Sequence, residues 1–152
     1  MPYHLSEEQK QEFYMVLEEV CKTSRILESH CYIQHGTTSV FRHSVSVAYL
    51  SYYLAQKMRA PVDIHSLIRG ALLHDYFLYD WHDGEGRHLH GFTHPECAFR
   101  NAEKDYTLSP RVKNIIVRHM FPLTPIPPAC KEAWIVCIAD KICAIEETLF
   151  NR

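Results

Sequence analysis

The sequence predicts an all-α fold, because apolar residues recur at helical spacing in about six segments of its 152 residues. No segment of comparable length alternates apolar and polar residues with period two, so no strand is required. The length suits one compact domain, and a hydrophobic fraction of 47% can supply an ordinary core. We therefore expect residues 1–152 to form a single helical bundle of about six helices.

Several of the predicted helices have a recognisable beginning. Ser6, followed by two glutamates and Gln9, begins the first helix. Thr93 and Glu96 form a capping box for a later one, and Ser109-Pro110 supplies a cap and an N1 proline for the next. The expected helices span about residues 6–29, 39–58, 62–77, 94–105 and 110–120, with a last one that follows Pro127-Pro128 and reaches about residue 149.

Composition excludes several classes of protein. With 16 Lys and Arg against 18 Asp and Glu, the net charge of -2 offers no broad basic surface, so we expect no nucleic-acid polymer as a partner. No apolar run reaches the roughly 18 residues that cross a membrane, and the start MPYHLSEEQK lacks the features of a signal peptide. We expect a cytoplasmic protein without membrane association. Its six cysteines form no C-x-x-C pair and are expected to be reduced and mostly buried.

Eleven histidines are unusual in such a chain, and four of them interrupt apolar helical rows. His43 occupies a vacant place in the series of Val40, Val47 and Leu50. Two aspartates interrupt such rows in the same way, one of them within AWIVCIADKICAI. The six ionisable residues on buried rows are His43, His74, Asp75, His94, His119 and Asp140.

A single buried histidine usually bonds a carbonyl, and a single aspartate usually caps a helix or pairs with an arginine. These ordinary partners do not account for six such residues, which come from five helices and must share one small core. An unpaired buried carboxylate costs several kcal/mol, whereas a pair of cations satisfies imidazoles and carboxylates together. The pattern therefore predicts a shared metal site.

The other histidines are weaker candidates. Those at positions 4, 30, 35 and 65 are expected to be solvated at helix ends or exposed positions. His82, His88 and His90 belong to a long irregular segment, residues 79–92, and could reach a substrate.

The order His43, His74-Asp75, Asp140, each on its own helix, resembles the HD-domain superfamily, whose name is this His-Asp doublet. The resemblance covers about residues 38–148 and is strengthened by Arg42 before the first histidine and Lys141 after the distal aspartate. It implies an all-helical fold and, as in most characterised members, a metal-dependent phosphohydrolase.

His94 and His119 match the extra ligands of binuclear HD proteins, in which the doublet aspartate bridges two metals. The resemblance implies that one ion takes His43, His74, Asp75 and Asp140, and that the other takes Asp75, His94 and His119. It also assigns catalysis to Asp75, His74 and Asp140. Two divalent transition-metal ions are implied, with iron or manganese favoured and zinc, cobalt or nickel open.

In the hydrolytic interpretation, two cations hold a bridging hydroxide that attacks phosphorus in a nucleotide or another phosphorylated small molecule. Arg42, Asp80, His82 and Lys141 are candidate substrate contacts. The residues after the doublet, Tyr76-Phe77-Leu78, lack the signatures of the cyclic-di-nucleotide phosphodiesterases and of the guanosine-tetraphosphate hydrolases, which disfavours those substrates.

Two alternatives stay open at the level of sequence. The same ligand order occurs in the mixed-valent di-iron oxygenases similar to myo-inositol oxygenase, which consume dioxygen and release no phosphate. A metal-stabilised regulatory module without turnover is the other alternative, although a complete ligand set argues against it.

Overall fold

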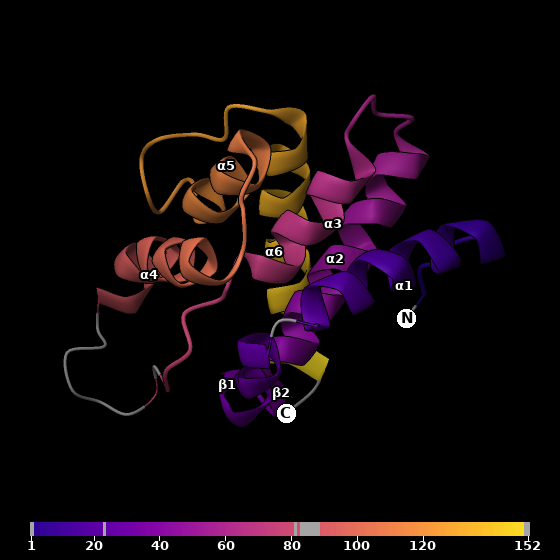
Figure 1. Ribbon diagram of the computed structural model, residues 1–152. Coiled ribbons are helices and arrows are strands. Elements are labelled where there is room, and N and C mark those ends of the chain that lie inside the picture. Colours follow the sequence, from indigo (N-terminus) through magenta and orange to yellow (C-terminus); the bar gives the residue numbers. More distant parts are fainter. Residues whose placement is uncertain (1, 23, 81, 83–88, 151–152) are drawn as a thin grey trace.

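The computed structural model describes residues 2–22, 24–80, 82 and 89–150. It confirms the all-α expectation, apart from one short antiparallel hairpin (Figure 1). The elements are α1 (Glu7–Cys21), a 3-10 helix (Ser24–Cys31), β1 (Ile33–His35), β2 (Thr38–Ser39), α2 (Val40–Lys57), α3 (Ile64–Leu73), α4 (His90–Asp105), α5 (Pro110–Arg118) and α6 (Lys131–Phe150).

Side-chain caps begin four of these helices and satisfy backbone N–H groups that lack a partner within the helix. In α1 the predicted start is a reciprocal capping box: Ser6 Oγ accepts from the backbone of Gln9, and the Gln9 side chain accepts from the backbone of Ser6. Ser39, Asp63 and Ser109 cap α2, α3 and α5 with a single bond each, in which the side-chain oxygen accepts from a backbone N–H of the first turn.

At the amino-terminal side one expected boundary is wrong, and one element was not expected. The first helix ends at Cys21 instead of about residue 29, and the chain continues as a 3-10 helix into the hairpin that the sequence did not predict. Gly36, with φ of 57°, allows the tight turn between β1 and β2. The runs of two and three residues are too short to show alternation, which is why they were missed.

Two boundaries near the His-Asp doublet are also wrong. Helix α3 ends at Leu73 instead of about residue 77, because the Asn101 side chain donates to the carbonyls of Tyr76 and Phe77 and replaces helical bonding there. Helix α4 begins at His90 instead of after Thr93. The Thr93 hydroxyl donates to the Leu89 carbonyl, so this residue lies inside the first turns and does not cap the helix.

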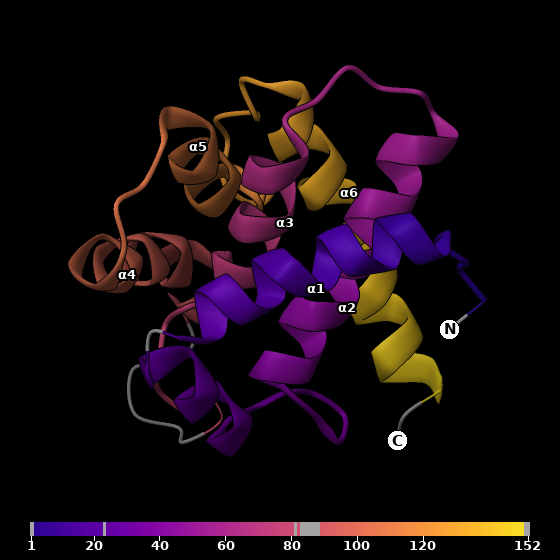
Figure 2. The ribbon, with the colours of Figure 1, turned by 45° about the vertical axis from the view of Figure 1, so that its right-hand side comes forward.

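Helix α2 packs against α3 and α6, while α5 packs against α3, α4 and α6. Helix α1 crosses the face formed by α2 and α3 (Figure 2). Of the helices described, none is long and apolar enough to cross a membrane. None of the six cysteines, all within the described residues, forms a disulfide, but only Cys137 and Cys143 are buried, so the expectation of mostly buried thiols is wrong.

Helix α3 lies close against α5 at Gly70. A Cβ atom there would lie 2.4 Å from Ile115 Cδ1 and 3.0 Å from both Ile115 Cβ and Cγ2. One helical turn beyond these residues, His74 and His119 lie with ring centroids 4.8 Å apart. The missing side chain of Gly70 therefore sets the helix spacing that brings these two histidines together.

We expect Gly70→Ala to lower the free energy of unfolding by about 1–2 kcal/mol, because overpacking against Ile115 exceeds the gain in helix propensity. Urea unfolding followed by circular dichroism measures this change. Gly91→Ala is the matched control: its Cβ would meet the ends of two flexible side chains, Leu123 Cδ2 at 2.8 Å and Met120 Cε at 3.8 Å, and the first of these can move. Equal effects of the two substitutions would contradict this account of α3–α5 packing.

Candidate metal centre

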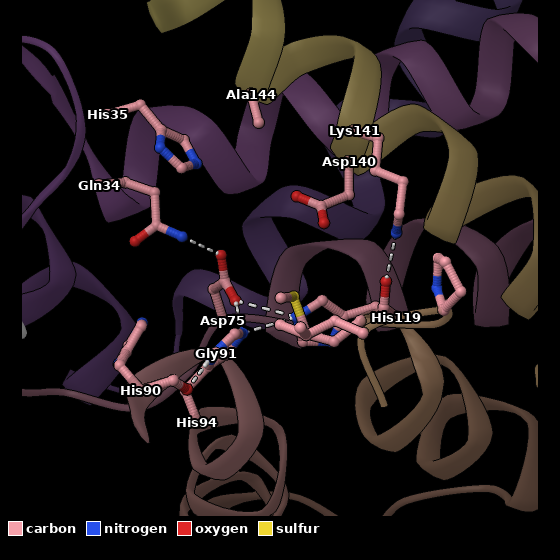
Figure 3. A pocket seen from close by; sticks show the side chains of 13 residues that line it. Gln34, His35, Asp75, His90, Gly91, His94, His119, Asp140, Lys141 and Ala144 are labelled. Atoms are coloured by element: carbon pink, nitrogen blue, oxygen red, sulfur yellow. Dashed lines mark hydrogen bonds and ion pairs between the residues drawn. The ribbon is translucent and has the colours of Figure 1, made fainter. Parts of the chain in front are cut away.

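One buried region of the bundle collects ionisable side chains from five helices or their ends. Those that meet there are His43 of α2, His74 and Asp75 just after α3, His94 of α4, His119 just after α5, and Asp140 of α6. Each of them is at most 8% exposed. Figure 3 shows Asp75, His94, His119 and Asp140 around one cavity.

The two carboxylate oxygens of Asp75 face different imidazoles. Oδ1 lies 3.1 Å from His94 Nε2 and 3.3 Å from His119 Nε2. Oδ2 lies 3.2 Å from His74 Nε2 and 3.7 Å from His43 Nε2. Asp75 therefore stands between two groups of ligand-type atoms, with one oxygen directed to each.

Asp140 completes the first of these groups. Its Oδ1 lies 2.9 Å from His43 Nε2 and 3.4 Å from His74 Nε2. Within each group the ligand atoms all lie within 4.8 Å of one another. Two atoms bound at about 2.0–2.2 Å to the same zinc ion lie about 3–3.5 Å apart, so these separations match a coordination sphere.

Hydrogen bonds to backbone carbonyls orient three of the imidazoles. The Nδ1 atoms of His74, His94 and His119 lie 2.6, 2.8 and 2.7 Å from the carbonyl oxygens of Ala71, His90 and Ile116, respectively. Because a carbonyl oxygen only accepts, each Nδ1 carries a hydrogen, and when a ring is neutral its lone pair is on Nε2. This is the tautomer in which Nε2 binds a metal.

The site contains polar atoms that the protein alone leaves unsatisfied. His94 Nε2 and His119 Nε2 lie 2.8 Å apart, and burial lowers the pKa of His119, so lone pairs face each other. His74 Nε2 and Asp75 Oδ1 are buried and have no hydrogen-bond partner within the described part of the chain. Such groups cost about 1–3 kcal/mol each. Two divalent cations would bind all of these atoms, so the donor set fits the metals that the sequence predicts.

Charge in the site keeps the carboxylates ionised. Burial alone would raise the pKa of Asp75 and of Asp140, but the adjacent imidazoles, His74 foremost for Asp75 and His43 for Asp140, hold both well below the usual range. In return, and against the effect of burial, hydrogen bonds to Asp140 and Glu147 raise the pKa of His43 to about 9. Both aspartates are therefore anionic, as metal ligands must be.

A cavity of about 760 Å³ opens beside these residues, a volume typical of sites for drug-sized ligands. Polar side chains reach it from β1, α4 and α6 and from the residues just after α3 and α5, and several apolar side chains form another part of its wall. Besides the ionisable cluster, its lining includes Gln34, His35, His90, Lys141, Gly91, Met120, Pro122, Leu123 and Ala144.

The sequence matches the HD domain family over residues 40–145, a range that contains all six ionisable residues and most of the chain. This chain belongs to the HD-domain family. The resemblance seen in the sequence over about residues 38–148 is thereby confirmed, and HD domains form a superfamily of metal-dependent phosphohydrolases.

The chain is 36% identical over 107 residues to Ribonuclease Y of Treponema pallidum (strain Nichols). The aligned region is 70% of this chain but 19% of that protein, so the chain spans about a fifth of the length of its relative. No solved structure matches the chain significantly.

The predicted substrate contacts of the HD domain are found in different places. Lys141 lines the cavity, but its ammonium group donates to the carbonyls of His119 and Cys137, at 2.9 and 3.3 Å. Arg42 lines a separate cavity of about 140 Å³. Asp80 and His82 are exposed and outside the lining of the large cavity, with the His82 backbone donating to Asp80 Oδ1 at 2.9 Å. A substrate role for these residues stays a prediction.

Among the loop histidines considered in the sequence, His90 lines the cavity, and its Nδ1 lies 2.7 Å from the Tyr79 hydroxyl. His88 lies outside the described residues. His35, expected to be solvated, instead is half-buried in the cavity wall, with its ring centroid 5.2 Å from that of His43. That expectation is wrong because β1 turns this residue toward the cluster.

Sequence reasoning also missed Gln34 and Glu147. Glu147 Oε2 lies 2.7 Å from His43 Nδ1, and its position two helical turns after Asp140 was a usable signal. Gln34 Nε2 donates to Asp75 Oδ2 at 2.5 Å. It lies on a strand of three residues, and nothing in its spacing points to the site.

We expect Glu147→Gln to weaken metal binding by about 10- to 100-fold, because a carboxylate that accepts from a ligating histidine orients it and raises its basicity. Titration of the metal-free protein with Mn²⁺ or Zn²⁺ measures the affinity. Glu146→Gln is the matched control, since Glu146 accepts from the Tyr3 hydroxyl and makes no bond to a histidine among those described. Equal metal affinities of the two variants would contradict this role of Glu147.

Proposed function

We propose that this HD domain is a metal-dependent phosphohydrolase that hydrolyses a phosphate ester of a small molecule. The observation that supports the proposal is the orientation of the imidazoles around Asp75. Three Nε2 atoms, aimed by Nδ1 bonds to carbonyls, face one ionised carboxylate whose two oxygens serve different groups.

His43, His74, Asp75 and Asp140 would hold one cation, and Asp75, His94 and His119 the other. Iron or manganese suits these nitrogen and oxygen donors, and zinc, cobalt and nickel bind the same types of ligand. When bound, such ions polarise phosphoryl oxygens and lower the pKa of water, so that hydrolysis proceeds near neutral pH.

Residues around the ligands prepare this chemistry. Gln34 fixes Asp75 through its Oδ2 atom, and Glu147 fixes His43 through Nδ1. The Lys141 ammonium group holds the carbonyl of His119 and places a positive charge beside the cavity, where a phosphoryl group is anionic. The apolar part of the wall limits the water that surrounds a bound ester.

The name of the relative, Ribonuclease Y, indicates RNA as the substrate of that protein. We favour a small phosphate ester for this chain for two reasons. Its net charge of -2 provides no broad basic surface for a polyanion. Its site lies in a cavity of about 760 Å³, which matches the size of a small molecule.

We expect the protein to bind about two transition-metal ions per chain, and Asp75→Ala to lose metal together with phosphatase activity. The loss of activity should exceed about 100-fold, because the carboxylate shared by both groups disappears. Elemental analysis of protein purified with metal, and phosphate release from a panel of nucleotides and other phosphate monoesters, measure the two quantities.

Glu103→Ala removes an exposed carboxylate of α4 and serves as the control, with unchanged metal content and turnover. Two findings would contradict the proposed centre. One is a wild-type protein that contains no metal although it was purified in the presence of metal ions. The other is an Asp75→Ala variant that keeps the wild-type metal content.

A second experiment separates hydrolysis from the oxygenase and regulatory alternatives. Protein loaded anaerobically with Fe²⁺ is supplied with phosphate esters or a short RNA, and phosphate release and dioxygen uptake are recorded in parallel. We expect phosphate release from esters without dioxygen uptake. Turnover that requires dioxygen and frees no phosphate would favour the oxygenase, cleavage of RNA alone would reject the small-molecule substrate, and inactivity of the metal-replete protein would favour a regulatory module.

A further inference from the structure

Gln34 has a fixed amide orientation at the centre of the site. Its side chain lies within hydrogen-bond distance of Asp75, with Nε2 2.5 Å from Oδ2. Because Nε2 is the donor of this bond and Oδ2 its acceptor, the NH₂ end of the amide faces Asp75. Figure 3 shows the amide oxygen pointing away from Asp75. The bond to Asp75 therefore fixes the orientation of the amide.

The oxygen at the other end of this amide has no partner. Gln34 is 5% exposed and lines the large cavity, and its Oε1 atom is buried with no hydrogen-bond partner in the part of the chain that the structure describes. A buried acceptor without a donor is unfavourable, and native proteins rarely leave one in place without a function. A donor supplied by a ligand in the cavity would satisfy it.

The position of Oε1 limits where that donor lies on the ligand. Both amide atoms are bonded to one carbon, so Oε1 is no more than about 5 Å from Asp75 Oδ2. A phosphoryl group held between the two groups of ligand atoms would lie against Asp75. The donor oxygen is then about three bonds from the ester oxygen, as in a hydroxyl group on the neighbouring carbon.

The rest of the cavity indicates the character of the organic part. Met120, Pro122, Leu123 and Ala144 contribute apolar side chains to the lining, and Gly91 exposes backbone without a side chain. The Lys141 ammonium group, in contrast, is already bonded to two carbonyls of its own chain. A substrate whose organic part is apolar or aromatic, with one hydroxyl group next to the phosphoryl group, therefore fits the lining of this cavity better than a substrate with a second phosphate.

We propose that Gln34 is a specificity-determining residue, whose Oε1 accepts a hydrogen bond from a hydroxyl group next to the phosphoryl group of a substrate with an apolar body. The inference rests on the proposed function for the position of the phosphoryl group. Gln34 and the hairpin that carries it precede residues 40–145, which match the family, so this recognition belongs to the part of the chain outside the shared domain.

The test compares two ligands that differ in one donor. The metal-loaded protein is titrated calorimetrically with 2-hydroxybenzyl phosphonate and with 2-methylbenzyl phosphonate, which have nearly the same size and a carbon–phosphorus bond that resists hydrolysis. We expect the hydroxyl compound to bind at least about tenfold more tightly to the wild type, because only it satisfies Oε1. In Gln34→Met, which keeps the side-chain length, the ratio should fall toward one.

Gln56→Met makes the same exchange at an exposed position at the end of α2 and should keep the wild-type ratio. Loss of the bond to Asp75 in Gln34→Met weakens both ligands alike, so the ratio separates recognition from positioning. A wild-type ratio near one, or an equal ratio in Gln34→Met, overturns the inference, and so does failure of both compounds to bind.

Hydrolysis of the corresponding 2-hydroxyphenyl and 2-methylphenyl phosphates is measured separately. If neither ester releases phosphate while the binding ratio behaves as expected, the proposed hydrolysis fails and the assignment of Gln34 stands. If both are hydrolysed at equal kcat/KM and bind equally, the assignment fails and the proposed hydrolysis stands.

Discussion

The buried carboxylate of Asp75 is the constraint on which the rest of this structure depends. It is 2% exposed, ionised, and surrounded by imidazoles from four other positions in the chain. An uncompensated charge in such a place would destabilise the fold by several kcal/mol. The helices that supply the imidazoles must therefore meet at this point, and the packing of α2 to α6 is arranged around it.

Two of the imidazoles around Asp75 are placed by the same local arrangement, a histidine directly after the end of a helix. His74 and His119 each occupy the position that follows the last helical residue, of α3 and of α5, and each Nδ1 bonds the carbonyl three residues earlier. Those carbonyls would otherwise lack a partner at the helix end. One hydrogen bond thus finishes the helix, fixes the tautomer and aims Nε2 at Asp75. The contact between Gly70 and Ile115 then fixes the distance between the two rings.

Helical periodicity was sufficient to predict the bundle and to select the six residues that meet in it, because each interrupts an apolar row that must face the core. It failed where the structure departs from helix. The end of α3 depends on Asn101, and the start of α4 lies a turn before the expected cap, contacts that no local pattern contains. Gln34 and His35 reach the site from a hairpin too short to carry a periodic signal.

The range that matches the HD domain family divides the residues of the site into two sets. The six ionisable residues all lie within that range, whereas Gln34, His35 and Glu147, which contact or adjoin them, lie outside it. Metal binding by the first set requires a fixed arrangement, because ligand distances tolerate little change. In the proposed function, the choice of substrate would depend on Gln34 in the second set. A change in the hairpin before α2 would then alter the choice of substrate while the six ionisable residues stay in place.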